Sequence, residues 1–198
     1  MNTSFSYAKP ETLIGAALAP LDWTRSVGLV VSFSLLNALA AQIAIPIGPV
    51  PITGQTFAVL LTGALLGSRL GATALIVYLV EGASGLPFFA GGTGGFAHIL
   101  GPAGGYLVSF PAAAYITGAF SEHGWDKRFI TAAAAMAIGS LVIVLAGWAW
   151  LSQFMGATAA LHAGVTRFII GDVVKIVLAA AVLPSGWALL KRKASQKS

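Results

Sequence analysis

The chain has 198 residues, of which 57% are hydrophobic and 9% are charged, and its mean hydropathy is +0.87. A soluble domain carries about 25% charged residues, so this composition excludes an ordinary water-soluble globule and predicts one all-α membrane domain over residues 1–198. The net charge of +5 does not indicate a nucleic-acid partner, because the basic residues lie between or beyond the apolar segments. The absence of cysteine excludes disulfides, thiol chemistry and Cys-based metal sites.

The N-terminal segment, about residues 1–24, is predicted to be a cytoplasmic arm that lies on the membrane surface. Its apolar run at 13–19 is short and is preceded by a single basic residue, Lys9, so a cleaved signal peptide is not expected. Apolar windows then predict a bundle of six transmembrane helices between about 25 and 190, followed by a basic cytoplasmic tail at 191–198. The predicted spans are 25–45, 55–67, 70–83, 104–120, 129–152 and 165–190.

The distribution of Lys and Arg predicts that both termini are cytoplasmic. With the N-terminus inside, Arg167 lies outside at the mouth of the sixth span, and Lys175 lies within the membrane. The other nine of the eleven basic residues then lie inside, at Lys9, Arg25, Arg69, Lys127, Arg128, Lys191, Arg192, Lys193 and Lys197. An odd number of spans would separate the termini and remove this bias.

Two segments on the predicted outer side, 46–55 and 85–106, are rich in Gly and Pro and nearly free of charge. A flexible solvated linker carries more polar residues, whereas Pro fixes the backbone and Gly permits close backbone approach. These loops are therefore predicted to pack over a site at the outer face. The alternative is that they merely cap the bundle.

Asp172 and Lys175 lie three residues apart inside the sixth predicted span. Positions i and i+3 share a helix face, and ionisable groups in a bilayer usually turn toward a partner, a cavity or a ligand. At 1.5 Å per residue, Asp172 lies roughly 10 Å below the outer mouth, beneath the Gly/Pro loops. The pair predicts a pocket with these two charges at its floor; the alternative is an ion pair that only joins helices. The aromatic residues predicted to line the pocket are Tyr78, Phe88, Phe89 and Tyr106.

Catalytic and metal-binding motifs are weak in this sequence. The glycine run at 91–95 lacks the Gly-Lys-Ser/Thr ending of a phosphate-binding loop. His98, His123 and His162 have no helical ligand spacing, so neither a metal nor a cofactor is predicted. No nucleophile and base stand at a catalytic spacing, although His98 and His162 fall in outer loops and leave an intramembrane hydrolase open as an alternative.

Five strings occur in order between about 25 and 185. They read IPIGPVPITGQT from Ile45, GSRLG from Gly67, GLPFFAGG from Gly85, GPAGGYL from Gly101 and GDVVK from Gly171. Together they resemble the BioY family, the biotin-specific substrate-capture subunits (S-components) of energy-coupling-factor (ECF) transporters. Each string alone is only suggestive, and the five at these spacings are specific.

The resemblance implies a six-helix subunit of the bacterial cytoplasmic membrane that binds biotin near the outer face and is not itself an enzyme. It implies ATPase subunits and a transmembrane coupling subunit as partners, which supply ATP hydrolysis. The sequence has no internal repeat, and the inner half of each span lacks ionisable residues. A self-sufficient secondary transporter of a small polar metabolite therefore stays open only as the alternative.

The resemblance also suggests roles for particular residues. Thr53 and Gln55 supply neutral hydrogen-bonding groups to biotin, beside the charged pair described above. Ser34 and Ala38 lie one helical turn apart in the first span and fall at the family's small-residue motif, which docks the coupling subunit. Small residues at this spacing let membrane helices approach closely, although such pairs also arise by chance in an alanine-rich chain.

Overall fold

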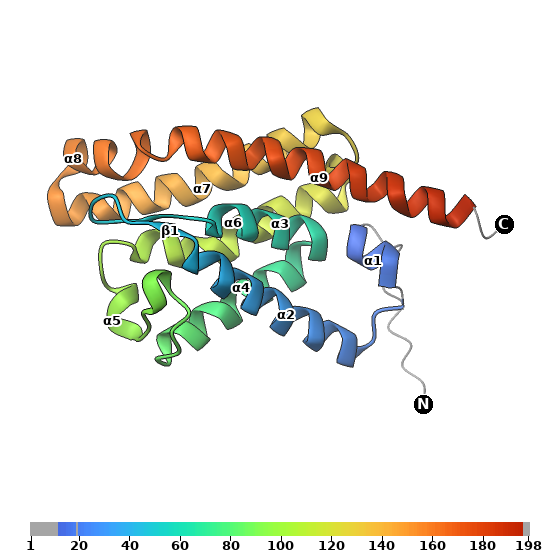
Figure 1. The fold of residues 1–198 in the computed structure, drawn as a ribbon, viewed down its shortest axis with the longest axis horizontal. Helices are drawn as coiled ribbons and strands as arrows, with labels where there is room; N and C mark the ends of the chain where they lie inside the picture. The colour runs from blue at the N-terminus through green and yellow to red at the C-terminus, as the bar shows by residue number, and fades with distance from the viewer. Residues whose placement is uncertain (1–11, 19, 196–198) are drawn as a thin grey trace.

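The computed structural model describes residues 12–18 and 20–195, and it is built almost wholly from helices (Figure 1). The remaining residues, among them Lys9 and Lys197 of the predicted cytoplasmic segments, lie outside the described part of the chain. The long helices are α2 (Trp23–Gln42), α3 (Gln55–Leu66), α4 (Ser68–Ala83), α6 (Gly104–Glu122), α7 (Phe129–Met155) and α9 (Ile169–Ser195). The shorter elements are α1 (Leu13–Leu18), β1 (Ala44–Ile45), β2 (Ile52–Thr53), η1 (Ala90–Gly92), α5 (Phe96–Ile99), η2 (Trp125–Lys127), α8 (Ala157–Leu161) and the π-helical turn η3 (His162–Thr166).

The long helices coincide with the predicted spans to within a few residues, but they differ greatly in length. Three described segments are long and apolar enough to cross a membrane, namely 23–42, 129–155 and 157–192. By contrast, α3 and α4 have 12 and 16 residues. The prediction of a mostly helical, apolar fold is confirmed, whereas six crossings with cytoplasmic termini stay a prediction.

Two connections are more ordered than the sequence predicted. The segment after α7 was expected to be a loop, but helix resumes at Ala157 after a turn at Gly156, whose φ is +82°. The alanine-rich composition of α8 explains this, because alanine has the highest helix propensity. The first Gly/Pro loop closes as a short antiparallel hairpin, in which Ala44 pairs with Thr53 and Ile45 with Ile52.

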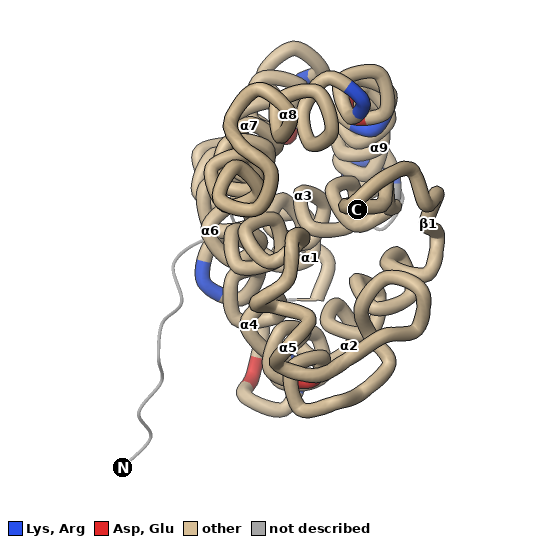
Figure 2. Tube along the Cα trace, turned by 90° about the vertical axis from the view of Figure 1, so that its left-hand side faces the viewer, with Lys and Arg blue, Asp and Glu red and all other residues tan. Residues whose placement is uncertain are grey.

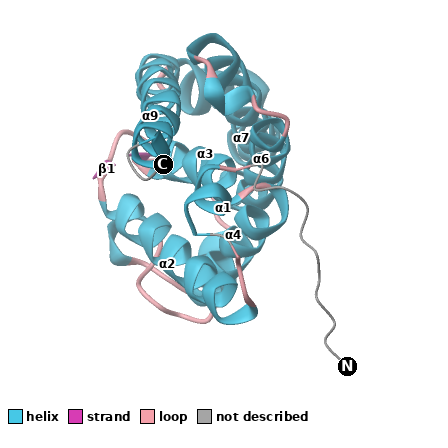
Figure 3. Cartoon of the chain, turned by 90° about the vertical axis from the view of Figure 1, so that its right-hand side faces the viewer, coloured by secondary structure: helices cyan, strands magenta, loops and turns pink. Residues whose placement is uncertain are grey.

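Helix α3 lies at the centre of the bundle (Figure 3). It contacts α2, α4, α6, α7 and α9, and α1 packs against it as well. Eight of its twelve residues are buried, and the remaining face carries Phe57, Leu61 and Leu65, which are partly buried against the core. A helix that is apolar all round is buried in a core, so the shortest of the predicted spans forms the axis around which the longer helices pack.

Glycines allow the central helices to approach one another closely. A Cβ atom at Gly63 of α3 would collide with the backbone of Ala114 in α6, and one at Gly118 of α6 would collide with the backbone at the start of α4. Glu122, the last residue of α6, also binds the first residue of α4. Its Oε1 accepts hydrogen bonds from the Ser68 backbone N–H at 2.7 Å and from the Ser68 hydroxyl at 2.9 Å. These contacts fix α3, α4 and α6 as one unit.

The two ends of the bundle differ in character. The hairpin, α5 and α8 gather at one end, and the start of α2 and the last turns of α9 lie at the other (Figure 1). Figure 2 views the molecule from the first of these ends: basic positions lie beside α8 and α9, and most of each helix carries no charge. We call the first the loop end, and it contains both Gly/Pro segments.

A polar cluster holds α9 at the opposite end. The Trp187 indole N–H donates to Asp126 Oδ2 at 2.6 Å, and the Lys127 ammonium lies 4.8 Å from the centre of the Trp187 ring. Burial raises the pKa of Asp126, and the Trp187 hydrogen bond and the Lys127 charge oppose that shift. With α9 fixed here, its other half is positioned at the loop end, beside α3 and α7.

Candidate ligand-binding site

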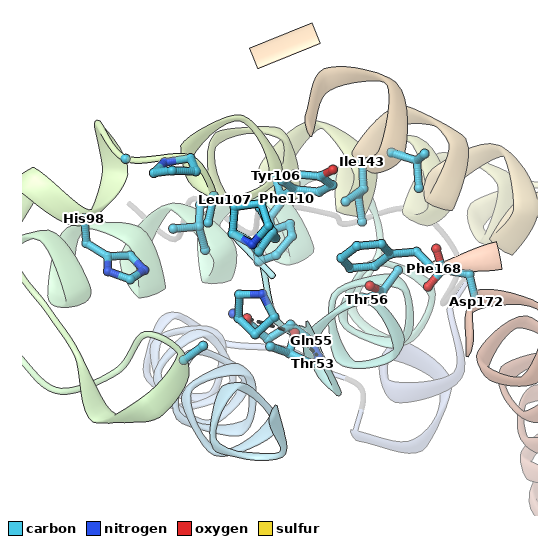
Figure 4. Close-up of a pocket in the computed structure, with 18 of the residues that line it drawn as sticks. Thr53, Gln55, Thr56, His98, Tyr106, Leu107, Phe110, Ile143, Phe168 and Asp172 are labelled. Atoms are coloured by element: carbon cyan, nitrogen blue, oxygen red, sulfur yellow. Dashed lines mark hydrogen bonds between the residues drawn. The ribbon is translucent and has the colours of Figure 1, made fainter. Parts of the chain in front are cut away.

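A cavity of about 390 Å³ lies at the loop end, between the Gly/Pro segments and the helix ends beneath them (Figure 4). Its volume falls within the range typical of small-molecule sites. The walls come from five parts of the chain: the 49–56 hairpin and the start of α3, the 90–103 segment, α6, α7 and α9. The lining residues are Pro49, Val50, Pro51, Thr53, Gln55, Thr56, Ala90, Ala97, His98, Gly101, Pro102, Ala103, Tyr106, Leu107, Phe110, Ile143, Val144, Phe168 and Asp172.

Thr53 and Gln55 line the cavity, as the sequence predicted, and they hold each other in place. The Thr53 hydroxyl donates to Gln55 Oε1 at 3.1 Å, and the Gln55 backbone N–H donates back to the Thr53 oxygen at 3.3 Å. The Gln55 amide nitrogen donates to the Tyr78 hydroxyl at 2.7 Å, which in turn donates to the Phe88 carbonyl at 3.2 Å. A satisfied polar chain of this kind orients side chains in an apolar interior.

Asp172 also lines the cavity, and its two oxygens have different partners. Oδ1 lies 3.3 Å from the Lys175 ammonium, and Oδ2 lies 3.4 Å from the Ser140 hydroxyl of α7. Lys175 is not among the residues that line the cavity, so the predicted pair presents its carboxylate to the cavity rather than its ammonium. A buried charge in an apolar bundle needs such a counter-ion to remain ionised.

Aromatic rings form the apolar part of the wall. Tyr106 and Phe168 stack with their centroids 5.8 Å apart, and the Tyr106 hydroxyl donates to the Gly164 carbonyl at 2.7 Å. Figure 4 shows Asp172 at one end of the cavity, His98 at the other, and the rings of Tyr106, Phe110 and Phe168 between them. Thr53 and Gln55 also lie between these two ends, so the middle of the site combines aromatic rings with neutral polar groups.

Three aromatic residues predicted to line the pocket lie behind its wall instead. Tyr78 and Phe89 are fully buried, with an edge-to-face contact of 5.8 Å between their rings. Phe88 packs against the core and accepts the Tyr78 hydrogen bond through its carbonyl. The sequence did not reveal this difference, because an aromatic residue next to a loop has the same pattern whether its ring faces the cavity or the core. Their role is to support Gln55 and the loop.

Several lining residues were not predicted to bind a ligand, and the sequence considered His98 only for a catalytic or metal site. His98 stacks on Phe89 at 5.1 Å, and its Nδ1 lies 3.2 Å from the Thr93 hydroxyl. Burial lowers the pKa of His98. Phe168 begins the segment that carries the charged pair, so its spacing of four from Asp172 was a usable signal. No signal marked Ile143 of α7, because an apolar span does not reveal which of its faces meets a ligand.

The two residues predicted to dock a partner lie inside the bundle. Ser34 is fully buried and its hydroxyl donates to Glu81 of α4, and Ala38 is 6% exposed within the core. In this structure the small side chains serve the packing of α2 against its neighbours. Docking through Ser34 and Ala38 stays a prediction, and it would require α2 to separate from α4.

An apolar helical bundle with a well-formed cavity that has a carboxylate at one end defines a membrane protein that binds a small solute. The BioY family profile matches residues 7–192, and the chain belongs to the BioY family. The family resemblance predicted from the five strings is thereby confirmed.

Individual relatives agree with this assignment. The chain is 45% identical over 159 residues to the "probable biotin transporter BioY" of Pyrococcus horikoshii, covering 80% of this chain and 93% of that protein. It is 35% identical over 152 residues to the "biotin transporter BioY" of Thermotoga maritima, covering 76% and 88%. Its fold matches the crystal structure of the S-component for biotin from an ECF-type ABC transporter, with a TM-score of 0.71, 25% identity, and coverage of 82% and 90%.

Proposed function

We propose that the chain captures biotin in the cavity at the loop end and acts as the substrate-specific subunit of an ECF-type transporter. The observation that carries this proposal is the position of Asp172, whose carboxylate lines an otherwise mainly apolar cavity and is held by Lys175 and Ser140. Membership of the BioY family and the names of the relatives support biotin as the solute.

The chemistry of biotin suits the groups that line the cavity. The ureido ring has two N–H donors and one carbonyl, and a buried carboxylate accepts such N–H groups in strong, charge-assisted hydrogen bonds. Thr53 and Gln55 offer neutral donors and acceptors farther along the cavity, between Asp172 and His98. The thioether ring and aliphatic chain of biotin match the stacked rings of Tyr106 and Phe168. Lys175 maintains the charge of Asp172 from behind.

The proposal also includes the membrane topology of the subunit and its partner subunits. The six long helices cross the bacterial cytoplasmic membrane with both termini inside, and the cavity opens to the outside. Biotin binding is the task of this chain, whereas ATPase subunits and a transmembrane coupling subunit supply the energy for release to the cytoplasm. The chain is a transport subunit and not an enzyme.

Uptake of labelled biotin tests the role as a transport subunit. The chain is expressed in a bacterium that neither makes nor imports biotin, together with an ECF module or with the same module carrying inactive ATPase subunits. We expect accumulation with the active module, and loss of most of it with the inactive one. Equal accumulation in both strains would instead favour the self-sufficient secondary transporter. Accumulation in neither strain would contradict biotin uptake.

A further inference from the structure

Arg167 lies beside the cavity wall, where it joins two segments that contribute lining residues. Its Nη1 is 3.5 Å from the carbonyl oxygen of Ile47 in the hairpin loop, a long and weak hydrogen bond. The next residue after Arg167 is Phe168, and the next after Gly48 is Pro49; both of these line the cavity. The guanidinium group therefore bridges the turn between η3 and α9 to the hairpin loop, directly beside cavity-lining positions.

Gly48 leaves room for this side chain. A Cβ atom at Gly48 would lie 3.1 Å from Arg167 Nη1, and the φ of Gly48 is +90°, which side-chain-bearing residues rarely adopt. The tip of the hairpin thus has room for the guanidinium group because residue 48 is glycine. Arg167 itself is exposed, and the Ile47 carbonyl occupies one of its five N–H donors.

The charges around the cavity are unevenly neutralised. Asp172 and Lys175 form an ion pair at 3.3 Å, so their charges offset each other. Within residues 12–18 and 20–195 no salt bridge joins Arg167 to a carboxylate. Its positive charge is therefore available to an anion at the mouth. A carboxylate that entered deeper would meet Asp172, which repels it.

We infer that Arg167 binds the carboxylate of the ligand at the mouth of the cavity. The inference rests on the proposed function, because biotin carries a carboxylate at the end of a flexible aliphatic chain, opposite its ureido ring. Asp172 lies in the first turn of α9, which begins at Ile169, and Arg167 lies two residues before that beginning, with a long side chain that extends beyond its own backbone. A ligand with its ureido ring at Asp172 then places its chain past Phe168 and its carboxylate at the guanidinium. A guanidinium offers a carboxylate two parallel N–H donors.

Comparison of biotin with biotinamide, whose terminal group is uncharged, tests the inference. Dissociation constants are measured for the full chain in nanodiscs, for the parent protein and for Arg167→Gln, Arg167→Lys and Arg69→Gln. Arg69 is exposed near the start of α4, at the end of the bundle opposite the cavity, and serves as the control. We expect Arg167→Gln to weaken biotin binding about tenfold and to change biotinamide binding by less than about threefold. Arg167→Lys should restore part of the preference for biotin, and Arg69→Gln should bind both ligands like the parent.

Two outcomes for Arg167→Gln would overturn the assignment. An equal loss for both ligands would mean that Arg167 only fastens the hairpin loop to α9. Unchanged binding of both ligands would place the carboxylate elsewhere, for example beside His98. Failure of the parent protein to bind biotin is a separate result, and it would overturn the proposed function and this inference together.

Discussion

Gln55 illustrates how a polar side chain is fixed inside an apolar bundle. Its amide nitrogen, amide oxygen and backbone N–H all have partners, which are the Tyr78 hydroxyl and the Thr53 hydroxyl. Tyr78 completes the chain by donating to the Phe88 carbonyl. The amide is therefore held in one orientation at the cavity wall, and the layer of residues behind the wall determines that orientation.

Replacement of Tyr78 by Phe tests this supporting layer. The variant leaves the Gln55 amide nitrogen and the Phe88 carbonyl without their partner in a buried site, which costs about 1–3 kcal/mol. We expect a lower melting temperature and weaker biotin binding than in the parent protein. Tyr115→Phe is the matched control, because Tyr115 is 52% exposed. Equal melting temperatures and affinities for the two variants would show that the Tyr78 hydroxyl does not hold the wall.

His98 gives the loop end a dependence on pH. Burial lowers its pKa from the ordinary value of 6.5, so the folded protein favours the neutral ring. The stability that this ring contributes is fully present above about pH 6.5 and is lost as the pH falls through the lowered folded-state pKa. We expect the melting temperature to fall on acidification below that value, and to fall less steeply in His98→Gln. The groups that titrate elsewhere act in both proteins, so identical slopes would contradict the prediction.

The helices were predictable from the sequence to different degrees. Apolar windows located all six long helices, because the length and hydropathy of a membrane helix are local properties. The central position of α3 was not predictable, since it depends on glycine contacts such as that between Gly63 and Ala114. Helix α8, which follows Gly156, was also missed. In so short a segment only the helix propensity of its residues distinguishes a helix from a loop.

The close approach of α3 and α6 is tested by adding one methyl group at Gly63. In Gly63→Ala the new Cβ atom meets the Ala114 backbone, so the helices must separate, and overpacking of this kind costs about 1–3 kcal/mol. We expect a lower melting temperature and a smaller folded fraction in size-exclusion chromatography. Gly28→Ala is the control, because nothing lies within 4 Å of a Cβ atom there. A Gly63→Ala variant as stable as Gly28→Ala would mean that α3 and α6 are less tightly packed than described.

The bundle as a whole is polarised between its two ends. The Gly/Pro segments, the cavity and Arg167 share the loop end, and the ends of α2 and α9 share the other (Figure 1). The positive-inside bias predicts that the loop end faces outward. The chain has no cysteine, so single-cysteine variants report sidedness without background.

Cysteines at Thr93 and Ser195 test this orientation. In intact cells an impermeant thiol reagent should label position 93, in the 90–103 segment, and should not label position 195 at the end of α9. Labelling at both positions after the membrane is permeabilised shows that each thiol is reactive. Labelling of 195 but not 93 in intact cells would reverse the orientation.

The candidate site combines residues that the sequence marked with residues that it did not. Asp172 was predictable because a charge is rare in an apolar span, and Thr53 and Gln55 because they lie in a string shared with a known family. Which ring faces the cavity was not predictable: of the four aromatic residues named from the sequence, Tyr106 lines the cavity and Phe89 is buried behind its wall. Side-chain direction depends on neighbouring helices that a single sequence does not place.

Calorimetric titration of the purified chain tests the central claim, that the Asp172 cavity binds biotin. The parent protein is titrated with biotin, and with thiamine and riboflavin as control ligands. Asp172→Asn is compared with Asp126→Asn, which alters a buried carboxylate at the opposite end of the bundle and keeps an acceptor for Trp187. We expect the parent to bind biotin alone among the three ligands. Asp172→Asn should lose about 2 kcal/mol or more of binding free energy, roughly thirtyfold in affinity, and Asp126→Asn should bind like the parent. A folded Asp172→Asn variant with the affinity of the parent would instead show that the charged pair only joins helices.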